Sequence, residues 1–185
     1  SPVSGPRLLA ATVEDGFELL KSLPGYLEIE ALSSGHINFT DSFTDAALAE
    51  HPGWLQRIGC QYHWQNRGYR DFQDFLDVLS SRKRKQMRKE REQVAGQGFD
   101  FEWLEGRQLD QAQWDFVYAC YANTYAVRRQ RPYLTREFFS LLAERMPESI
   151  RVVLAKQGSR PVAMAFSLVG GDSFYGRYWG CLAEF

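Results

Sequence analysis

The chain has 185 residues, of which 44% are hydrophobic and 24% charged, and its formal net charge is −1. This composition is typical of a folded globular protein that is long enough to bury a core. The near-neutral charge excludes a uniformly basic nucleic-acid-binding surface, so any anion site must be local. No run of about 18 apolar residues is present, so we expect no membrane-spanning segment.

The three cysteines, Cys60, Cys120 and Cys181, are widely spaced. They form neither a disulfide framework nor a metal-binding pattern, so we expect small buried residues, a cytoplasmic location and no metal site. The chain stops just after a strand-like stretch, which predicts that it is part of a longer protein.

The first predicted domain covers residues 1–66. Apolar residues recur with a period near 3.6 from Arg7 to Leu23, which predicts a helix, and a shorter helix is predicted at 45–51. Alternating apolar and polar residues predict short strands in the rest of this domain. These strands are expected at 36–40, 54–58 and 60–65.

The second predicted domain covers residues 67–185. It begins with an amphipathic helix after the N-cap Asp71, followed by a basic helix that ends at 96–98. The remaining elements follow the order β-α-α-β-β-β. They are a strand at 99–103, helices at 110–129 and 135–146, and strands at 150–156, 162–169 and 173–179. The short loops between the last three strands predict an antiparallel meander.

Seven of the 22 lysines and arginines lie in residues 82–91. Helical spacing places Arg84 beside Arg88 and Lys85 beside Lys89, and each like-charge pair costs about 0.2–0.5 kcal/mol. The cost indicates either acidic neighbours or an anionic ligand, such as the phosphates of an acyl donor, a tRNA or another nucleic acid. A solvated charged face is the alternative interpretation.

A glycine-bearing loop, 3–7, directly precedes the first predicted helix. Free N–H groups at a helix start, together with Arg7, are able to hold a phosphate. A plain loop-to-helix junction is the alternative.

Polar and aromatic residues gather at 63–69, where a predicted strand leads into a turn. His63 is a candidate general base there, or else a hydrogen-bonded histidine of a sheet.

The last strand carries an arginine among aromatic residues. Regular alternation places Tyr175, Arg177 and Trp179 on one face and Phe174 and Tyr178 on the other. Arg177 in an aromatic sheet face needs an acidic side chain or a ligand as its partner.

Four separated motifs resemble a bacterial family described as peptidoglycan biosynthesis/recognition proteins, which belongs to the GNAT (N-acetyltransferase-like) superfamily and is related to the Fem-type aminoacyl/peptidyltransferases. The first motif is HWQNRGY at 63–69, and the second combines FL at 75–76 with LSSRKRK at 79–85. The other two are RPYLT at 131–135 and GRYWGC at 176–181. The resemblance extends over essentially the whole chain.

The resemblance implies an α+β, GNAT-like fold, the acyl-CoA N-acyltransferase fold, with a mixed, mostly antiparallel sheet and flanking helices. Residues 1–66 would form the C-terminal part of a first GNAT-like half. Residues 67–185 would form a basic helical segment and the N-terminal β-α-α-β-β-β part of a second half.

The function implied by the resemblance is N-acyl or aminoacyl transfer to an amine of a peptidoglycan precursor. The acyl donor would be acyl-CoA or aminoacyl-tRNA, which makes tRNA a candidate partner, and an oligomeric state is left open. The alternative is a non-catalytic module that recognises peptidoglycan fragments or RNA.

The resemblance also implies roles for individual residues. The expected catalytic residues are His63 and Tyr178, the expected donor-binding residues are Ser4, Gly5, Pro6, Arg7, Arg82, Lys83, Arg84 and Arg88, and the expected acceptor-binding residues are Asn66, Arg67, Tyr69, Arg177 and Trp179.

Overall fold

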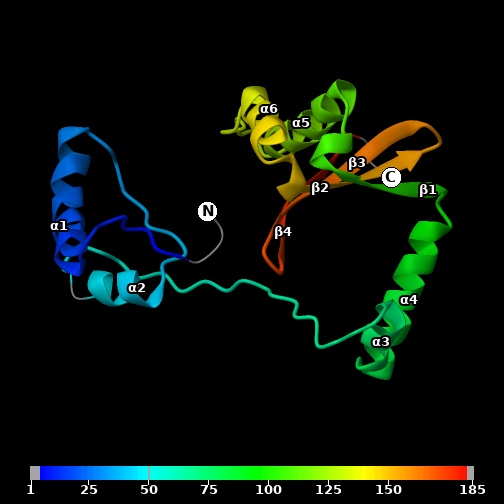
Figure 1. The fold of residues 1–185 in the computed structure, drawn as a ribbon, viewed down its shortest axis with the longest axis horizontal. Coiled ribbons are helices and arrows are strands. Elements are labelled where there is room, and N and C mark those ends of the chain that lie inside the picture. The colour runs from blue at the N-terminus through cyan, green and yellow to red at the C-terminus, as the bar shows by residue number, and fades with distance from the viewer. Residues whose placement is uncertain (1–4, 50, 183–185) are drawn as a thin grey trace. The chain divides into compact units, whose positions relative to one another are not determined.

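The chain divides into two compact units, residues 1–66 and 67–185 (Figure 1). The structure is a computed structural model that describes residues 5–49 and 51–182. It is a mixed α+β structure in which all of the sheet described lies in the second unit.

The first unit contains the helices α1 (Val13–Ile29) and α2 (Ser42–Ala49). The predicted start of the first helix at Arg7 was wrong, because Thr12 is the N-cap and its side chain accepts the Asp15 N–H at 3.1 Å. Acidic residues in the first turn also favour a start here. The helix continues through Pro24 to Ile29, beyond the apolar period that the sequence shows up to Leu23.

The three strands predicted in the first unit were wrong, since residues 5–49 and 51–66 form none. Residues 54–66 are extended but have no partner strand, and Ile58 and Tyr62 are 93% and 96% exposed. Alternation predicts a strand only where another segment supplies the ladder hydrogen bonds, and a single sequence does not show whether one is available.

The second unit begins with α3 (Phe72–Asp77) and α4 (Ser81–Ala95). The predicted cap Asp71 is confirmed, because its carboxylate accepts the Asp74 N–H at 2.9 Å. Ser80 caps α4, and its hydroxyl accepts the Lys83 N–H at 3.5 Å. Gly96 follows α4 as its C-cap, as predicted.

A four-stranded antiparallel sheet of order β1-β2-β3-β4 forms the rest of the unit, which confirms the predicted meander. The strands are β1 (Phe99–Glu105), β2 (Ile150–Gln157), β3 (Arg160–Gly170) and β4 (Ser173–Cys181).

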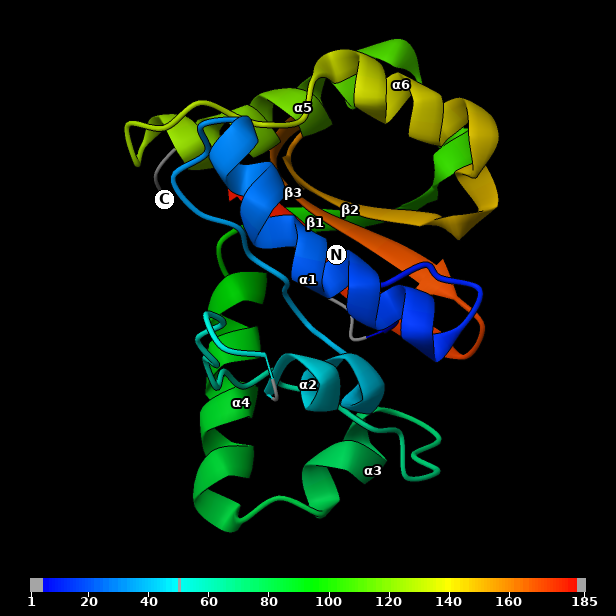
Figure 2. The same cartoon turned by 90° about the vertical axis from the view of Figure 1, so that its left-hand side faces the viewer.

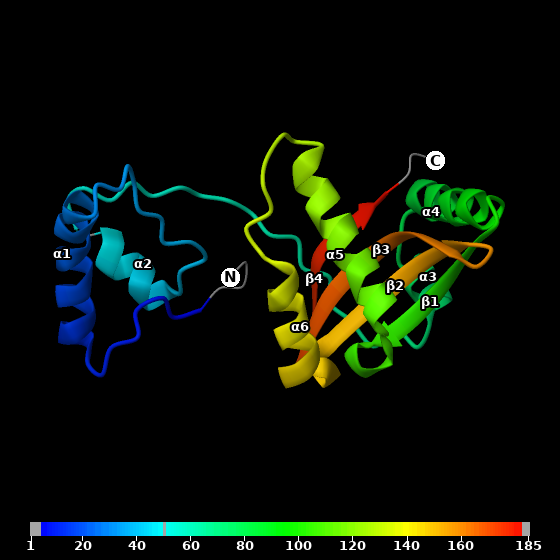
Figure 3. The same ribbon diagram turned by 90° about the horizontal axis from the view of Figure 1, so that it is seen from above.

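Between β1 and β2 the chain forms α5 (Gln111–Ala126) and α6 (Arg136–Arg145), which lie on the same side of the sheet (Figures 2 and 3). Short 3-10 helices at Gly106–Gln108 and Pro147–Ser149 flank this insertion. Asp110 and Thr135, predicted as the first residues of these helices, are their N-caps, and each side chain accepts the backbone N–H three residues on. The β-α-α-β-β-β order is therefore confirmed.

The core lies between these two helices and the sheet. Its fully buried side chains include Val117, Cys120, Tyr121, Phe139, Ile150, Val152 and Leu154. Cys120 is buried as predicted, whereas Cys60 is exposed and Cys181 half-buried, so the expectation of three buried cysteines was wrong.

The opposite side of the sheet, which we call the open face, carries exposed aromatic side chains. Phe101 and Trp103 on β1 are 55% and 64% exposed, and Phe174 and Trp179 on β4 are 56% and 73% exposed. The rings of Trp103 and Phe174 lie 6.4 Å apart, centroid to centroid.

Close contact between β4 and α5 leaves no room for a side chain at Gly180. A Cβ there would lie 2.7 Å from the Cys120 carbonyl oxygen and 3.0 Å from Thr124 Cγ2. We therefore expect Gly180→Ala to lower the free energy of unfolding by about 1–3 kcal/mol, measured by chemical denaturation. Gly176, on the same strand, has nothing within 4 Å of a built Cβ, so Gly176→Ala is the matched control. Equal losses in both variants would contradict this packing argument.

Candidate functional site

Strand β4 contains a β-bulge at Arg177. Tyr178 pairs with Phe166 of β3, and Gly176 pairs with the next residue, Ser167, so that Arg177 has no partner on β3. Bulges change the direction of side chains and are frequent beside active sites. This geometry therefore makes Arg177 and its neighbours candidates for a functional site.

The bulge also reverses the predicted faces of β4. Tyr175 and Tyr178 share the core side of the sheet, whereas Phe174 and Trp179 share the open face. The predicted pairings of Tyr175 with Trp179 and of Phe174 with Tyr178 were wrong, because period-two alternation changes sign at an inserted residue.

Two motifs that are distant in sequence meet beside the bulge. The hydroxyl oxygens of Tyr133 and Tyr178 are 2.7 Å apart, and Arg177 Nη2 donates to the Tyr178 hydroxyl at 3.3 Å. The guanidinium carbon of Arg177 also lies 5.0 Å from the centroid of the Tyr178 ring. The loop before α6 and the bulge of β4 thus present two phenols and one cation at the same place.

The buried Tyr121 of α5 positions these groups. Its hydroxyl accepts the Leu134 N–H at 3.1 Å, which fixes the loop that carries Tyr133. Its ring lies 5.1 Å from that of Tyr125 and 4.8 Å from that of Tyr178, centroid to centroid. We call Tyr121, Tyr125, Tyr133 and Tyr178 the tyrosine cluster.

The hydroxyl groups of the cluster differ in acidity. The hydrogen bond with Tyr178, helped by the nearby Arg177, holds the pKa of Tyr133 below its ordinary value. Burial, and then the hydrogen bond with Tyr133, raise the pKa of Tyr178. Burial also raises the pKa of Tyr125. Tyr133 is therefore the phenol of this trio that gives up its proton first, and Tyr178 remains a donor.

Arg177 is half-buried, and within residues 5–49 and 51–182 no carboxylate forms an ion pair with it. An arginine keeps its charge at all physiological pH values, so a partly desolvated guanidinium favours a nearby anion. The guanidinium and the Tyr178 hydroxyl together can donate hydrogen bonds to a carboxylate, a phosphate or the oxyanion of an acyl-transfer intermediate.

The expected donor-binding residues of α4 do not share one environment. Arg84 is half-buried and hydrogen-bonds Asp77 of α3, and the exposed Arg88 hydrogen-bonds Gln73 of α3. Arg82 is exposed, and no side-chain hydrogen bond links it to another described residue. Lys83 is exposed as well.

The expected phosphate loop near the N-terminus does not lead directly into a helix. The Gly5 N–H donates to the Phe39 carbonyl at 3.2 Å, and Arg7 Nε donates to the Asn38 carbonyl at 2.7 Å. The backbone of residues 38–39 thus accepts hydrogen bonds from two groups that were expected to bind phosphate. Pro6 is exposed within this segment, and Ser4 lies outside the described residues.

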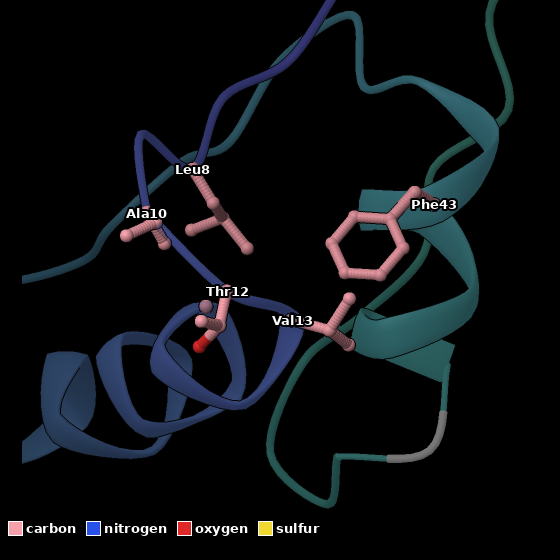
Figure 4. Close-up of a pocket in the computed structure, with 7 residues that line it drawn as sticks. Leu8, Ala10, Thr12, Val13 and Phe43 are labelled. Atoms are coloured by element: carbon pink, nitrogen blue, oxygen red, sulfur yellow. The ribbon is translucent and has the colours of Figure 1, made fainter.

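A pocket at the start of α1 is apolar rather than basic. Leu8, Ala10, Thr12, Val13 and Phe43 line it together with Ala11 and Gly16 (Figure 4). The first turn of α1 carries Glu14 and Asp15, whose charges disfavour an anion at this helix start.

The motif at 63–69 spans both units. In the first, His63 is exposed and its Nε2 lies 3.2 Å from Gln61 Oε1, and Asn66 is exposed. In the second, Arg67 is exposed and the Tyr69 ring packs against Phe75 of α3 in a T-shaped contact at 5.6 Å. Trp179 lies on the open face, on the opposite side of the sheet from Tyr178.

Within the described ranges, no group of three or more His, Cys, Asp or Glu side chains is placed to hold a metal ion. In the same part of the chain, no helix combines the length and apolar character needed to cross a membrane.

Sequence reasoning missed Tyr133, Tyr121 and Tyr125 as site residues. The sequence did contain a signal for Tyr133, because this residue lies in the RPYLT motif at 131–135 that supports the family resemblance. The resemblance assigned no role to Tyr133. Tyr121 and Tyr125 gave no signal, because aromatic residues at helical spacing are usually part of a core.

The fold and the site define an α+β protein in which two helices cover one side of an antiparallel sheet and a bulged strand presents an arginine among tyrosines. The chain belongs to the FemAB-like family, described as peptidoglycan biosynthesis/recognition, whose model matches residues 1–185. A comparison with curated proteins found no match.

The contact between Tyr133 and Tyr178 can be tested by titration. We expect Tyr178→Phe to raise the pKa of Tyr133 towards its ordinary value, because the main hydrogen bond that lowers it is lost. The measurement is the near-ultraviolet absorbance of phenolate as the pH rises, with Tyr133→Phe to assign the transition. Tyr26→Phe, which removes an exposed tyrosine of the first unit, is the control. An unchanged Tyr133 transition in Tyr178→Phe would rule out this coupling.

Proposed function

We propose that the protein is an acyltransferase of GNAT type that transfers an acyl or aminoacyl group to an amine of a peptidoglycan precursor. The observation that carries this proposal is the half-buried Arg177, which meets tyrosine hydroxyls rather than a carboxylate at the bulge of β4. Family membership supports the cell-wall context, and the β-α-α-β-β-β order is similar to that of a GNAT half.

The reaction consists of one substitution at a carbonyl carbon. The amine nitrogen attacks the activated acyl carbon, the carbonyl oxygen becomes an oxyanion, and the bond to the sulfur or oxygen of the donor then breaks. The proton released by the amine passes to the leaving group or to water. Groups that donate hydrogen bonds to the oxyanion lower the barrier most when they are already in position.

In this proposal Arg177 and Tyr178 supply those hydrogen bonds. Arg177 brings a permanent charge, and the raised pKa of Tyr178 keeps its hydroxyl protonated and able to donate. Tyr133 has a lowered pKa and its hydroxyl oxygen lies 2.7 Å from that of Tyr178. As the phenolate it is the group best suited to take the amine proton, which it then passes to the leaving group or to water, while the Tyr178 hydroxyl turns to the oxyanion. Tyr133 thereby takes the general-base role for which the sequence had made His63 a candidate.

The donor is acyl-CoA or aminoacyl-tRNA, and the acceptor is a peptide amine. Both donors carry phosphates, so the exposed cations of α4 are the second part of the proposed site. Substrate positioning would supply much of the remaining rate enhancement.

The test is a transfer assay with the full chain, an amine-bearing muropeptide, and acyl-CoA or aminoacyl-tRNA in separate reactions. Loss of one oxyanion donor costs about 10²–10³-fold in kcat, so we expect a decrease of this size for Arg177→Met. Arg160→Met, at an exposed arginine of β3, is the matched control and should retain full activity.

Two outcomes would contradict the proposal. Full kcat in Arg177→Met would show that the cluster is not the site of transfer. Muropeptide binding that requires Arg177 but is accompanied by no turnover with either donor would instead identify a recognition module.

A further inference from the structure

The open face of the sheet has large aromatic side chains on its two edge strands and small side chains between them. Trp103 of β1 and Trp179 of β4 end one cross-strand row, whose inner members are Val153 of β2 and Ala165 of β3. The central strands place further small side chains on this face, at Ala155, Ala163 and Ser167. We call the four edge residues Phe101, Trp103, Phe174 and Trp179 the aromatic rim.

The aromatic rim reaches over the central strands. Neighbouring strands lie about 4.8 Å apart, so β1 and β4, the first and last of the sheet, are separated by about 14 Å. The ring centroids of Trp103 and Phe174 are nevertheless only 6.4 Å apart. Ser167 of β3 pairs with Arg151 of β2 and Gly176 of β4, and it is only 6% exposed although it lies on this face. The rim thus partly covers a floor of small side chains, while its own rings stay exposed.

Several polar groups of the open face lack partners inside the chain. The indole N–H groups of Trp103 and Trp179 form no hydrogen bond with residues 5–49 and 51–182, and neither does the Ser167 hydroxyl. An indole N–H that leaves water needs an acceptor, and a serine hydroxyl offers two lone pairs. The face therefore holds donors at its edges and an acceptor on its floor, which two copies of the same face can exchange.

The open face is also electrically neutral. The charged side chains near its end, Glu105 of β1 and Arg151 of β2, form an ion pair, with Nη2 3.3 Å from Oε1. The aromatic rim and the small residues between its members carry no charge. Two copies of one surface present the same charges to each other, and like charges facing each other across an interface are strongly disfavoured. A surface that binds its own copy must therefore be neutral, and the open face meets this condition.

The area of the aromatic rim is large enough for a specific contact. Its four side chains are between 55% and 73% exposed. Since each aromatic side chain can bury about 150–250 Å², the rim leaves about 500 Å² of apolar surface in water. Pairing two copies would remove about 1,000 Å² from water through the rings alone, which is about the minimum for a specific interface. Tryptophan, which supplies half of the rim, is also enriched among the residues that dominate binding energy.

We propose that the open face binds the open face of a second copy, so that the protein forms a two-fold symmetric dimer. The two sheets pack face to face about 10 Å apart, and the rims interdigitate. The Trp179 indole N–H donates to the hydroxyl of the partner subunit's Ser167. Dimerisation of this kind goes beyond the proposed function, because it uses the side of the sheet opposite the tyrosine cluster.

The test is sedimentation velocity of the full chain over a range of protein and salt concentrations. We expect a monomer–dimer equilibrium with a Kd of about 1–10 µM, as suits an interface of minimal area. Added salt should leave the Kd unchanged or lower it, because apolar burial is not screened. Tryptophan emission should also shift to shorter wavelength as the protein concentration rises, because Trp103 and Trp179 leave water.

Three variants locate the contact. Trp179→Ala should raise the Kd at least about 30-fold, which is the loss expected for a tryptophan that dominates binding. Phe101→Glu, which places like charges on facing copies, should leave the protein monomeric at about 100 µM. Trp64→Ala is the matched control, since Trp64 is 63% exposed in the first unit, and it should retain the Kd within about twofold. Circular dichroism verifies that each variant is folded.

Several outcomes would overturn the dimer. A wild-type chain that stays monomeric at about 100 µM would do so, as would an unchanged Kd in both Trp179→Ala and Phe101→Glu. Dissociation as salt rises would assign association to unlike charges elsewhere on the chain. A monomer whose tryptophan emission shifts with phosphatidylcholine vesicles would assign the open face to a lipid surface. Arg177→Met should dimerise like the wild type, so a failure of the transfer assay leaves this inference standing.

Discussion

A buried phenol must place its hydroxyl group on a polar partner, and Tyr121 does so with the backbone N–H of Leu134. This hydrogen bond ties the middle of α5 to the loop that precedes α6, while the ring of Tyr121 packs against Tyr178 on the sheet. Helix, loop and strand are thereby held in one arrangement. The distance between the Tyr133 and Tyr178 hydroxyls, and with it the acidity of Tyr133, depends on this constraint.

The protein stabilises its arginines in different ways, and the difference indicates their roles. Arg84 has a carboxylate and a carbonyl oxygen of its own unit as partners, which is how a structural cation is usually satisfied. Arg177 contacts the hydroxyl and the ring of Tyr178 and forms no ion pair with a carboxylate of residues 5–49 and 51–182, so its charge is hydrogen-bonded but not neutralised there. Charge that is held in place without being neutralised is what a site for anions requires.

Local signals predicted the local features of the second unit well. Asp71 was predicted as an N-cap, and Asp110 and Thr135 as helix starts, because a side-chain oxygen before an apolar period is a short-range property. Long-range features were not predictable in this way. Whether residues 54–66 find a partner strand depends on segments distant in the chain, and which arginines of α4 face α3 depends on how the two neighbouring helices pack. Of the candidate site, the strand pattern singled out Arg177 and the family resemblance singled out Tyr178, whereas Tyr133 emerged only from the fold.

The bulge separates the charge of Arg177 from the pairing of its strand. Because Arg177 pairs with nothing on β3, Gly176 and Tyr178 keep consecutive partners on that strand, Ser167 and Phe166. In terms of the gene, Arg177 is equivalent to one inserted codon in a regular meander. Deleting that codon alone would remove the cation and leave every β3 partner of β4 in place.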